Sequence, residues 1–499
     1  MLHPDLKTFK EHAHPGALVP VYRELIADLE TPVAAYLKVS EGATHSFLLE
    51  SVEHTGTLGR YSFIGANPSV LCRATRNAFT VVRNGVEERT SSENPLFELR
   101  KLMQAYEPVK LPGLPEFHGG AVGYLAYDAV RYFERLPDNN PDTLGLPDLC
   151  FMITDTLVVF DHVSNRMKIV CNVHVGDDAD AAYAEAETKI AELEAKLLSP
   201  CPLPPLSPSD ISAPPTTPAN LTSNFTREGY CDAVRKAKEY IAAGDVFQVV
   251  LSQRFTRPVS ASPVTLYRAL RCVNPSPYMV LMQFPEFALV GSSPEVMTQV
   301  KNGTCMVRPI AGTRPRGANL QEDLAHEADL LADEKEIAEH VMLVDLGRND
   351  LGRVSDPGTV APVPQKRMVI ERYSHVMHIV SEVVGNLRKE LDAFDAIAAT
   401  FPMGTVSGAP KIRAMQIIDE LEPQRRGPYS GGCGYISFSG EMDTCILIRT
   451  MVVKDGLAYL QAGAGLVYDS EPEKEFEETV NKARALMKAI DFAEQGLQS

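Results

Sequence analysis

Short stretches of alternating or continuous apolar residues follow one another through the first 175 positions, a pattern typical of β-strands. Strands are predicted over 45–53, 60–70, 152–162 and 167–173. The segment FTVVRNGVEERT (79–90) predicts a hairpin that turns at Asn84-Gly85, because this dipeptide accepts the positive φ angles of a type I′ turn. Residues 97–106 carry the spacing of an amphipathic helix.

A helix rich in alanine and glutamate is predicted over 178–198, and the chain then changes character. Residues 199–218 contain eight prolines in twenty positions. Because proline removes backbone donors and fixes φ, this segment is expected to run extended over the surface. The sequence therefore predicts three parts: an N-terminal domain over 20–198, a linker over 199–222 and a C-terminal domain over 223–490.

The second half combines strands with longer helices. The expected elements are a helix over 227–243, a nearly continuous apolar strand over 246–255, strands over 277–284 and 288–293, and a hairpin over 297–309 that turns at Asn302-Gly303. Strands and helices do not alternate in regular βαβ order. The pattern therefore predicts an α+β fold.

A first acidic helix is predicted over 327–350. Its apolar residues at helical spacing are Leu330, Ile337, Val341 and Val344, and Glu336, Glu339 and His340 fall on a neighbouring face. Since Mg²⁺ is held in proteins by one or two carboxylates, waters and substrate oxygens, this face is a candidate for metal binding.

A second acidic helix is predicted after Ser470, a candidate N-cap with Glu473 three positions on. Its acidic stripe is Glu471, Glu475 and Glu478, and its apolar stripe is Phe476, Val480, Ala483 and Met487. Carboxylates at this spacing repel each other by about 0.2–0.5 kcal/mol per pair. A solvated face tolerates that repulsion and a bound cation reverses it, so the periodicity leaves both interpretations open.

Glycines are dense between the two predicted acidic helices. They occur in FPMGTVSGAPK (401–411), throughout residues 426–450 and in LQAGAGLVYDS (460–470). Glycine accepts positive φ and lets a ligand approach the backbone. The sequence therefore predicts a pocket built largely from peptide groups.

Composition and charge narrow the class of protein. With 499 residues, 44% hydrophobic and 23% charged, the chain is typical of a globular protein with more than one core. A net charge of −17 without a basic block argues against nucleic acid or an anionic membrane surface as partner. No apolar run approaches the ~18–20 residues of a membrane span, and the first residues lack the apolar segment of a signal peptide. Nine scattered cysteines without a C-x-x-C pair indicate a reducing, cytoplasmic location.

Six motifs occur in an order that is characteristic of one family. They are PIAGTRPRG (309–317), DEKEIAEH (333–340), MLVDLGRNDLGRV (342–354), VMHIVSEV (376–383), FPMGTVSGAPK (401–411) and GAGLVYDSEPEKEFEET (463–479). Together they resemble the chorismate-utilising enzymes. With LLES (48–51) and NPSPYM (274–279) added, the chain resembles the anthranilate-forming large subunits of that family, over about residues 20–490. The resemblance implies two β-sheets packed face to face with helices outside.

The same resemblance implies a reaction. Ammonia adds at C2 of chorismate as the C4 hydroxyl leaves, and pyruvate is then eliminated to give anthranilate, the first step of tryptophan biosynthesis. The ammonia is expected from glutamine, through a glutamine amidotransferase small subunit, in a heterotetramer of two large and two small subunits. Mg²⁺ is the implied cofactor.

Substrate contacts are implied at Gly312, Thr313, Tyr429 and Arg449, and at the amides of Gly463, Ala464 and Gly465. Taken alone, PIAGTRPRG is also typical of an ordinary turn, and Arg449 of a solvated strand end. The planar fork of an arginine nevertheless matches the carboxylates of chorismate.

The implied metal ligands are Glu339 and Glu478, one from each acidic helix, with Glu336 and Glu475 expected to act through water. The implied catalytic residues are His378, Glu295, Thr405 and Lys411. Glu295 matches the acid that assists the leaving hydroxyl, and His378 matches the residue associated with elimination. Without the resemblance, a histidine in an apolar strand is more often a core residue and Lys411 a solvated cation.

Two positions bear on which reaction of the family is performed. Gln248 stands where isochorismate-forming relatives carry a lysine base, and a glutamine amide takes up no proton near neutral pH. Ala311 stands where aminodeoxychorismate synthases often carry a nucleophilic lysine. Both residues favour an external amine as the incoming group, with aminodeoxychorismate synthase or isochorismate synthase as the alternative.

Two further patterns carry no such function. Gly463-Ala464-Gly465 begins like a dinucleotide fingerprint, but Tyr468 replaces the third glycine and no βαβ unit surrounds it. Gly432-Cys433-Gly434 hints at a nucleophile, but no glutaminase domain is visible. We therefore expect neither a bound dinucleotide nor glutamine hydrolysis by this chain.

LLES lies in the first predicted domain and NPSPYM in the second, and neither is expected to be part of the active site. The resemblance makes them two halves of a feedback pocket for L-tryptophan, with contacts from Glu50, Ser51, Pro277, Tyr278 and Met279. A carboxylate and a hydroxyl suit the ammonium, and the other side chains suit an indole. Read alone, LLES is a strand end and NPSPYM a turn. A non-catalytic amino-acid sensor is the third possibility, which the acidic helices and Arg449 argue against.

Overall fold

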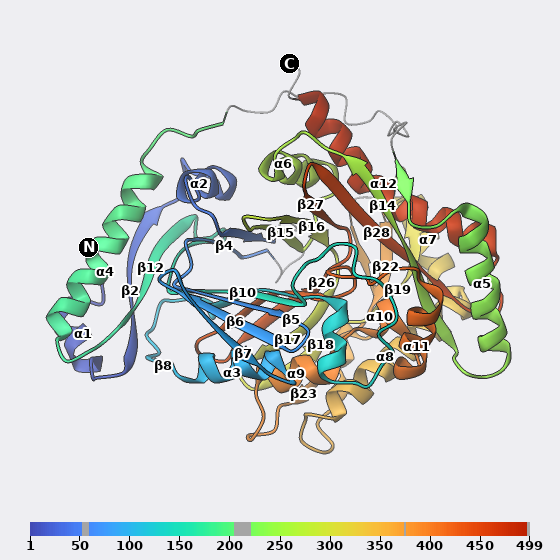
Figure 1. Ribbon diagram of the computed structural model, residues 1–499, viewed down its shortest axis with the longest axis horizontal. Helices are drawn as coiled ribbons and strands as arrows, with labels where there is room; N and C mark the ends of the chain where they lie inside the picture. Colours follow the sequence, from blue (N-terminus) through green and yellow to red (C-terminus); the bar gives the residue numbers. More distant parts are fainter. Residues whose placement is uncertain (52–58, 204–220, 374–375, 497–499) are drawn as a thin grey trace.

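The computed structural model describes residues 1–51, 59–203, 221–373 and 376–496. Within them, strands form two large sheets and one small sheet, with helices around them (Figure 1). The larger sheet has fourteen described strands, in the order β1 (Leu2–His3), β2 (Ala17–Ile26), β12 (Arg166–His174), β11 (Thr156–Asp161), β4 (Tyr61–Ala66), β3 (Ser46–Glu50), β15 (Tyr278–Gln283), β16 (Ala288–Ser293), β27 (Thr450–Lys454), β28 (Leu457–Leu466), β14 (Gln248–Pro258) and β13 (Thr222–Ser223), with β8 (Glu107–Pro108) beside β2 and β24 (Gly408–Ala409) beside β14.

The second sheet has eleven described strands. Their order is β20 (Ala361–Pro362), β23 (Val383–Asn386), β18 (Thr304–Val307), β17 (Val296–Lys301), β26 (Met442–Ile446), β25 (Gly432–Ser437), β9 (Gly120–Leu125), β10 (Leu149–Thr154), β5 (Val70–Thr75), β6 (Ala78–Arg83) and β7 (Val86–Ser91). The small sheet has the order β19 (Ile310–Pro315), β22 (Val376–Val380) and β21 (Val369–Arg372).

Strands from both halves of the chain join edge to edge in each large sheet. In the larger sheet β3 pairs with β15, and in the second sheet β9 pairs with β25. The N-terminal and C-terminal halves therefore share both sheets. Residues 204–220 of the predicted linker lie outside the described residues, so the predicted limits 20–198, 199–222 and 223–490 stay a prediction.

The two large sheets pack face to face. In β11, Leu157 and Val159 belong to the same buried cluster as Cys150 and Met152 of β10. The alternate residues of each strand point the other way, into separate clusters that contain helices. Because successive side chains of a strand leave opposite faces, the shared cluster lies between the sheets. The predicted fold class is confirmed.

Helices cover the outer faces of both sheets (Figure 1). On the larger sheet lie α1 (Leu6–His12), α2 (Pro32–Val39), α4 (Ala179–Leu197), α6 (Pro263–Val273) and α12 (Pro472–Gly496). Against the second sheet lie α3 (Pro95–Gln104), α8 (Glu334–Gly352) and α9 (Ala393–Thr400), whereas α5 (Arg227–Ala242), α10 (Gly404–Ser407) and α11 (Lys411–Leu421) pack against β14 of the larger sheet. The remaining helices are η1 (Tyr127–Tyr132), α7 (Leu320–Ala332) and η2 (Pro364–Lys366). None of the described helices is long and apolar enough to cross a membrane.

Both predicted hairpins have the expected turns. Asn84 and Gly85 have φ angles of 50° and 78°, and Asn302 and Gly303 have 51° and 73°. In each hairpin the flanking strands pair directly across these two residues. Positive φ at both central positions is the geometry of a type I′ turn.

The prediction of one helix over 327–350 is wrong. The chain forms α7 and α8 instead, and the carboxylate of Asp333 accepts the N–H groups of Lys335 and Glu336 as the cap of α8. The change of direction at Asp333 interrupts the apolar stripe. Leu330 is fully buried in α7, whereas Val341 of α8 is 42% exposed.

The predicted N-cap at Ser470 is also wrong. Helix α12 begins at Pro472, and the Ser470 hydroxyl accepts the N–H of Val467 at 3.0 Å rather than an N–H of the helix. The apolar stripe of this helix is buried as expected at Ala483 and Met487.

Candidate active site

A cavity of ≈ 930 Å³ collects residues from elements that are far apart in the sequence. Strands β14, β19, β22 and β28 contribute to its lining, together with α8, α10 and α12. The predicted site residues that line it are Glu295, Gly312, Thr313, Glu336, Glu339, His378, Thr405, Tyr429, Arg449, Gly463, Gly465, Glu475 and Glu478. Gln248 and Ala311 line it as well.

One wall of the cavity is the open edge of β28. This strand pairs with β14 along its whole length but with β27 only as far as Leu460. Peptide groups in an antiparallel pair point alternately toward and away from the neighbour. The Gly463 carbonyl points away from β14, since it accepts Lys482 Nζ at 2.9 Å, so the peptide groups of Gly463 and Gly465 face the open edge.

The peptide groups of Ala464 point in the opposite direction to those of the two neighbouring glycines. It stands opposite Leu251, so its peptide groups point into the ladder, and its side chain is fully buried in the core. The structure therefore does not bring the Ala464 amide to the open edge, and the predicted substrate contact of this residue stays a prediction. A side chain at either flanking glycine would force a neighbour to move, because a Cβ would lie 2.8 Å from the Tyr429 hydroxyl at Gly463 and 2.9 Å from Gln248 Nε2 at Gly465.

Arg449 supplies positive charge at the same wall. Its φ angle is 50°, an uncommon backbone conformation for a non-glycine residue and one of the kinds that cluster at active sites. Within the described residues its guanidinium forms no ion pair or hydrogen bond, and burial lowers its pKa. A buried cation without a counter-ion beside a cavity is suited to bind an anion.

Glu295 is a buried carboxyl group that stays protonated near neutral pH. Burial raises the pKa of Glu295 to about 8, against smaller effects of Thr405 and Lys482 that lower it. Among the described residues, neither Glu295 Oε1 nor Thr405 Oγ1 has a well-aligned hydrogen-bond partner. The two groups are neighbours with free hydrogen-bonding capacity at a cavity, which suits proton donation to a ligand.

The position of His378 defines its tautomer. Nδ1 lies 2.8 Å from the Gly312 carbonyl oxygen, which can only accept, so Nδ1 carries the proton. Burial lowers the pKa of His378, and the nearby charges of Arg449 and Lys482 lower it further. The ring is therefore neutral, with Nε2 unprotonated and able to act as a base.

Four carboxylates from two helices face the cavity. Burial raises the pKa of Glu336 in α8 and of Glu475 in α12, and the adjacent carboxylates Glu339 and Glu478 raise them further. No three His, Cys, Asp or Glu side chains of the described chain are grouped closely enough to hold a metal alone. The set fits an ion such as Mg²⁺ that takes one or two protein carboxylates and completes its shell with waters and a ligand.

Two of these four carboxylates also bind side chains of the protein. Gln248 Nε2 donates to Glu339 at 2.7 Å, and Glu478 pairs with Lys482 at 2.7 Å. Lys482 was not predicted from the sequence. The signal for it is the Glu-to-Lys spacing of four within α12, which is typical of a helical ion pair.

Lys411 does not line the cavity. Its ammonium group pairs with the buried carboxylate of Asp350 at 2.7 Å and donates to the Thr400 carbonyl at 3.0 Å. Its charge is neutralised inside the protein, so the structure does not place Lys411 with the other predicted site residues, and its catalytic contribution stays a prediction. His340, expected beside the acidic face, is fully buried and bonded to Ser381.

A second cavity lies next to the first, and residues 274–279 separate the two. Its lining includes the predicted inhibitor contacts Glu50, Ser51, Pro277, Tyr278 and Met279. The Glu50 carboxylate accepts the Tyr267 hydroxyl and pairs with Arg271 at 3.3 Å. The buried Ser51 hydroxyl has no hydrogen-bond partner among the described residues.

The chain matches known proteins along nearly its whole length. A family model described as chorismate binding enzyme matches residues 44–488. The chain is 46% identical over 497 residues to anthranilate synthase component 1 of Acetivibrio thermocellus, with 99% of each chain covered. It is 48% identical over 483 residues to the protein of the same name from Pseudomonas aeruginosa, with 96% of this chain and 97% of the other covered.

A solved structure agrees with these matches. The crystal structure of anthranilate synthase component I from Streptococcus pneumoniae TIGR4 aligns with a TM-score of 0.72 at 37% identity, covering 93% of this chain and 99% of that chain. The sequence motifs, the paired sheets and the whole-length matches all lead to one family. The chain belongs to the chorismate binding enzymes and, within them, to the anthranilate synthase component 1 proteins.

Proposed function

We propose that the chain converts chorismate and ammonia to anthranilate and pyruvate, as the large subunit of a cytoplasmic anthranilate synthase. The observation that carries this proposal is the meeting of three features in one cavity: the unpaired guanidinium of Arg449, the protonated carboxyl of Glu295 and the carboxylates of α8 and α12. The relatives of the chain bear this activity in their names.

In the proposed reaction, Arg449 and the open peptide edge of β28 bind the carboxylates of chorismate. Ammonia forms the bond to C2 while the ring double bonds shift and the C4–O bond breaks. Glu295 gives its proton to the departing hydroxyl so that water leaves, and the added nitrogen releases one proton, which returns Glu295 to its protonated form. His378 Nε2 then takes the proton from C2 as the C3–O bond breaks and the ring becomes aromatic, and the departing enolpyruvate takes up a proton to become pyruvate. We assign Mg²⁺ to Glu339 and Glu478, where the ion would offset the negative charge of the bound substrate.

The incoming group is proposed to be ammonia rather than water or an enzyme amine. Gln248 donates its amide to Glu339 and has no basic nitrogen, and Ala311 offers no nucleophile. These two positions support anthranilate formation over the isochorismate and aminodeoxychorismate alternatives. The test is one assay with chorismate, Mg²⁺ and ammonium, in which anthranilate is identified by its fluorescence.

We expect the isolated chain to form anthranilate from ammonium at alkaline pH but not from glutamine. Ammonium salts supply more free ammonia as the pH rises, whereas no glutaminase domain is recognisable in the sequence. Adding a glutamine amidotransferase subunit should enable glutamine use, within a proposed heterotetramer of two subunits of each kind. Productive consumption of glutamine by the purified chain alone would contradict the two-subunit assignment.

We further propose that L-tryptophan binds in the second cavity and inhibits the enzyme. The two cavities share a wall, since Asn274, Pro275 and Ser276 line the first and the next three residues line the second. Ser276 Oγ donates to the Ser293 carbonyl at 2.7 Å, close to Glu295. A ligand that displaces this wall would alter the catalytic side, and coupling of about 1–3 kcal/mol is typical of such linkage.

Ser51→Phe is expected to abolish inhibition by tryptophan and to leave uninhibited turnover largely intact, because the added ring fills the proposed inhibitor cavity. Binding can be followed directly, since the chain contains no tryptophan and the ligand is the only indole present. Indole emission should shift on mixing with the unsubstituted chain, and chorismate should reverse that shift. If the emission changes neither on mixing nor on addition of chorismate, the proposal of a feedback site is contradicted.

A further inference from the structure

We propose that Arg426, together with Glu422, is a positioning residue that fixes three segments of the catalytic cavity relative to one another. Neither side chain lines that cavity. Arg426 is 2% exposed and lies just before Tyr429, in the segment that follows α11. The proposal rests on the function proposed above and names a further residue for that reaction.

The guanidinium of Arg426 uses all of its N–H groups. Nε and Nη2 donate to the two carboxylate oxygens of Glu422 at 3.0 and 2.7 Å. Nη1 donates to the Val406 carbonyl at 2.7 Å and to Ser430 Oγ at 3.2 Å. Nη2 also donates to the Val250 carbonyl at 2.7 Å. An arginine has five N–H donors, so the fork is fully satisfied without water.

Each of the three additional acceptors belongs to a wall of the cavity. Val406 follows Thr405 in α10, Ser430 follows Tyr429, and Val250 itself lines the cavity from β14. The guanidinium also lies 5.6 Å from the centre of the Tyr429 ring. One side chain therefore connects the Thr405, Tyr429 and β14 walls, which are far apart along the chain.

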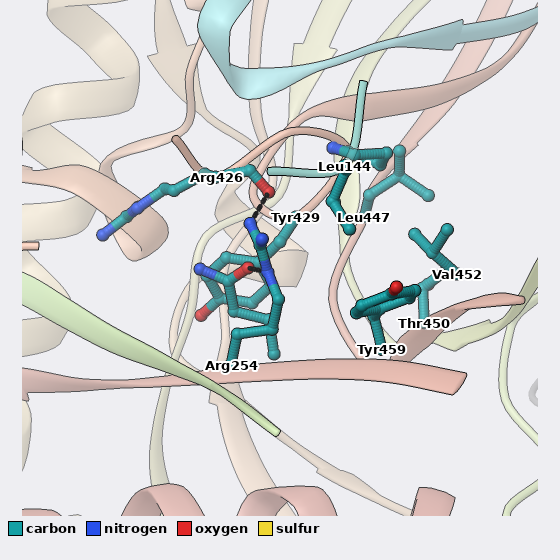
Figure 2. A pocket seen from close by; sticks show the side chains of 10 residues that line it. Leu144, Arg254, Arg426, Tyr429, Leu447, Thr450, Val452 and Tyr459 are labelled. Atoms are coloured by element: carbon teal, nitrogen blue, oxygen red, sulfur yellow. Dashed lines mark hydrogen bonds between the residues drawn. The ribbon is translucent and has the colours of Figure 1, made fainter. Parts of the chain in front are cut away.

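The carboxylate partner is itself fixed to the sheet. Glu422 Oε1 accepts the backbone N–H of Ser252 at 2.8 Å and its hydroxyl at 2.9 Å. Arg254 holds the Arg426 backbone, donating to its carbonyl oxygen at 3.1 Å, while the Arg426 side chain extends away from Tyr459 (Figure 2). The pair thus has little freedom to move.

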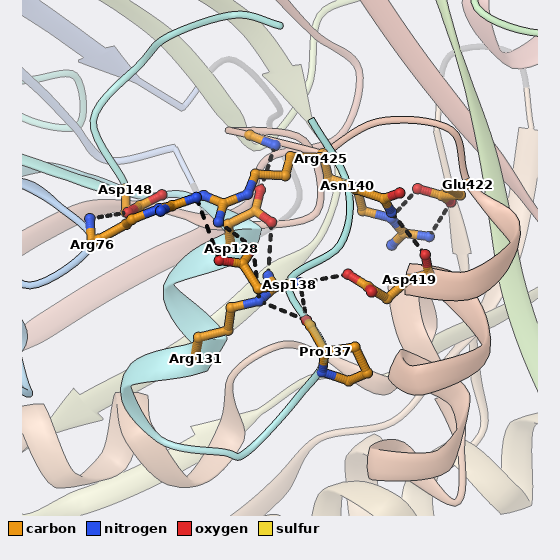
Figure 3. A network of polar contacts seen from close by, with 12 residues as sticks. Arg76, Asp128, Arg131, Pro137, Asp138, Asn140, Asp148, Asp419, Glu422 and Arg425 are labelled. Atoms are coloured by element: carbon orange, nitrogen blue, oxygen red, sulfur yellow. Dashed lines mark hydrogen bonds and ion pairs between the residues drawn. The ribbon is translucent and has the colours of Figure 1, made fainter. Parts of the chain in front are cut away.

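A second network of polar contacts binds the segment between Arg426 and Tyr429 to the N-terminal half of the chain. Asp128 accepts the N–H of Gly427 at 2.8 Å and pairs with Arg131 at 2.9 Å, and Arg131 also donates to Asp419 at 2.6 Å (Figure 3). Asn140 donates to the Asp419 carbonyl at 2.9 Å. The N-terminal half of the chain therefore fixes the segment that carries Tyr429 in the C-terminal half.

Stability alone does not explain such an arrangement. A buried ion pair costs desolvation energy, and well-packed apolar residues often replace one without loss of stability. What apolar residues do not replace is a planar fork that binds three backbone and hydroxyl groups in fixed directions. The connected groups are those next to catalytic and substrate-binding residues, so the geometry points to positioning.

Arg426→Lys tests the proposal, because lysine keeps the charge but has three donors and no fork. We expect kcat/KM for chorismate to fall by about 100-fold, the effect of a displacement of about 1 Å at a catalytic site. The alkaline limb of the pH–rate profile should also move, because Thr405 is a neighbour of Glu295. A residue that serves stability alone leaves that limb in place.

Arg413→Lys is the control of the same residue type. Arg413 lies in α11, shortly before Glu422, but its side chain pairs with Asp245 at 2.6 Å and belongs neither to the cavity lining nor to the two networks described above. We expect its kcat/KM and pH profile to stay within about twofold of the unsubstituted chain, even where the melting temperature falls.

A double substitution, Arg426→Met with Glu422→Gln, separates positioning from folding. It removes both buried charges together, so the folded state is expected to persist in circular dichroism while the activity remains low. Native kcat/KM in either Arg426 variant would overturn the proposal, as would a loss of activity that only follows the unfolded fraction. Absence of anthranilate formation by the unsubstituted chain would instead overturn the proposed function, so the two failures are distinguishable.

Discussion

Glu295→Gln is expected to lower kcat by about 10²–10⁴-fold, the contribution typical of a general acid. Glutamine has nearly the same shape but no proton to give to the departing hydroxyl. The raised pKa of about 8 also predicts a pH dependence. The group acts in its protonated form, so the rate, expressed per concentration of free ammonia, should fall as the pH rises through about 8.

His378→Ala provides the contrast to this variant. The loss of Glu295 should stop addition and elimination alike, whereas the loss of His378 Nε2 should affect elimination more, so that the aminated intermediate accumulates. Chromatography of the products distinguishes the two patterns. A Glu295→Gln variant that retains its rate and its alkaline limb would show that another group supplies the proton.

Glu339→Gln and Glu478→Gln are expected to abolish the dependence on Mg²⁺ and to remove most activity. A loss of about 3 kcal/mol of transition-state stabilisation corresponds to about 10²-fold in rate. The measurement pairs calorimetric titration with Mg²⁺, in the presence of chorismate, with the rate. Circular dichroism should stay native, since Gln248 and Lys482 each lose only one partner at a cavity surface.

Glu471→Gln is the control for the metal assignment. Glu471 lies just before the same helix, but its carboxylate is exposed, pairs with Lys474 at 2.6 Å and does not line the cavity. Its substitution should change neither the Mg²⁺ titration nor the rate. If Glu478→Gln behaves like this control, the acidic stripe of α12 is an ordinary solvated face.

Local patterns predicted much of the fold. The Asn-Gly dipeptides fixed both hairpins because positive φ is a property of the dipeptide itself. The helix over 327–350 was wrong at Asp333, where a side-chain cap competes with continued periodicity and only tertiary packing decides between them. The pairing of β3 with β15 and of β9 with β25 joins strands far apart in the chain, which no local pattern reveals.

The site was predicted largely through the resemblance, and what the motifs alone do not reveal has physical causes. A motif gives the order of Gly463, Ala464 and Gly465 but not which peptide groups a neighbouring strand uses, and register assigns Ala464 to the ladder. Lys411 lies in a family motif, yet its charge is neutralised by Asp350 from another helix. Arg426 and Glu422 have no distinguishing signal in the sequence, because their importance arises from three acceptors that meet only in the folded chain.

The shared sheets make the molecule a single cooperative unit, although its sequence reads as two domains. Separation of the halves between β3 and β15, and between β9 and β25, would expose four strand edges with free N–H and C=O groups. Neither half then has a closed surface of its own, and each would associate with any chain that offers a matching edge. The N-terminal half is therefore expected to complete its folding only after the C-terminal half has been synthesised. A substitution that destabilises either half is expected to destabilise the whole chain.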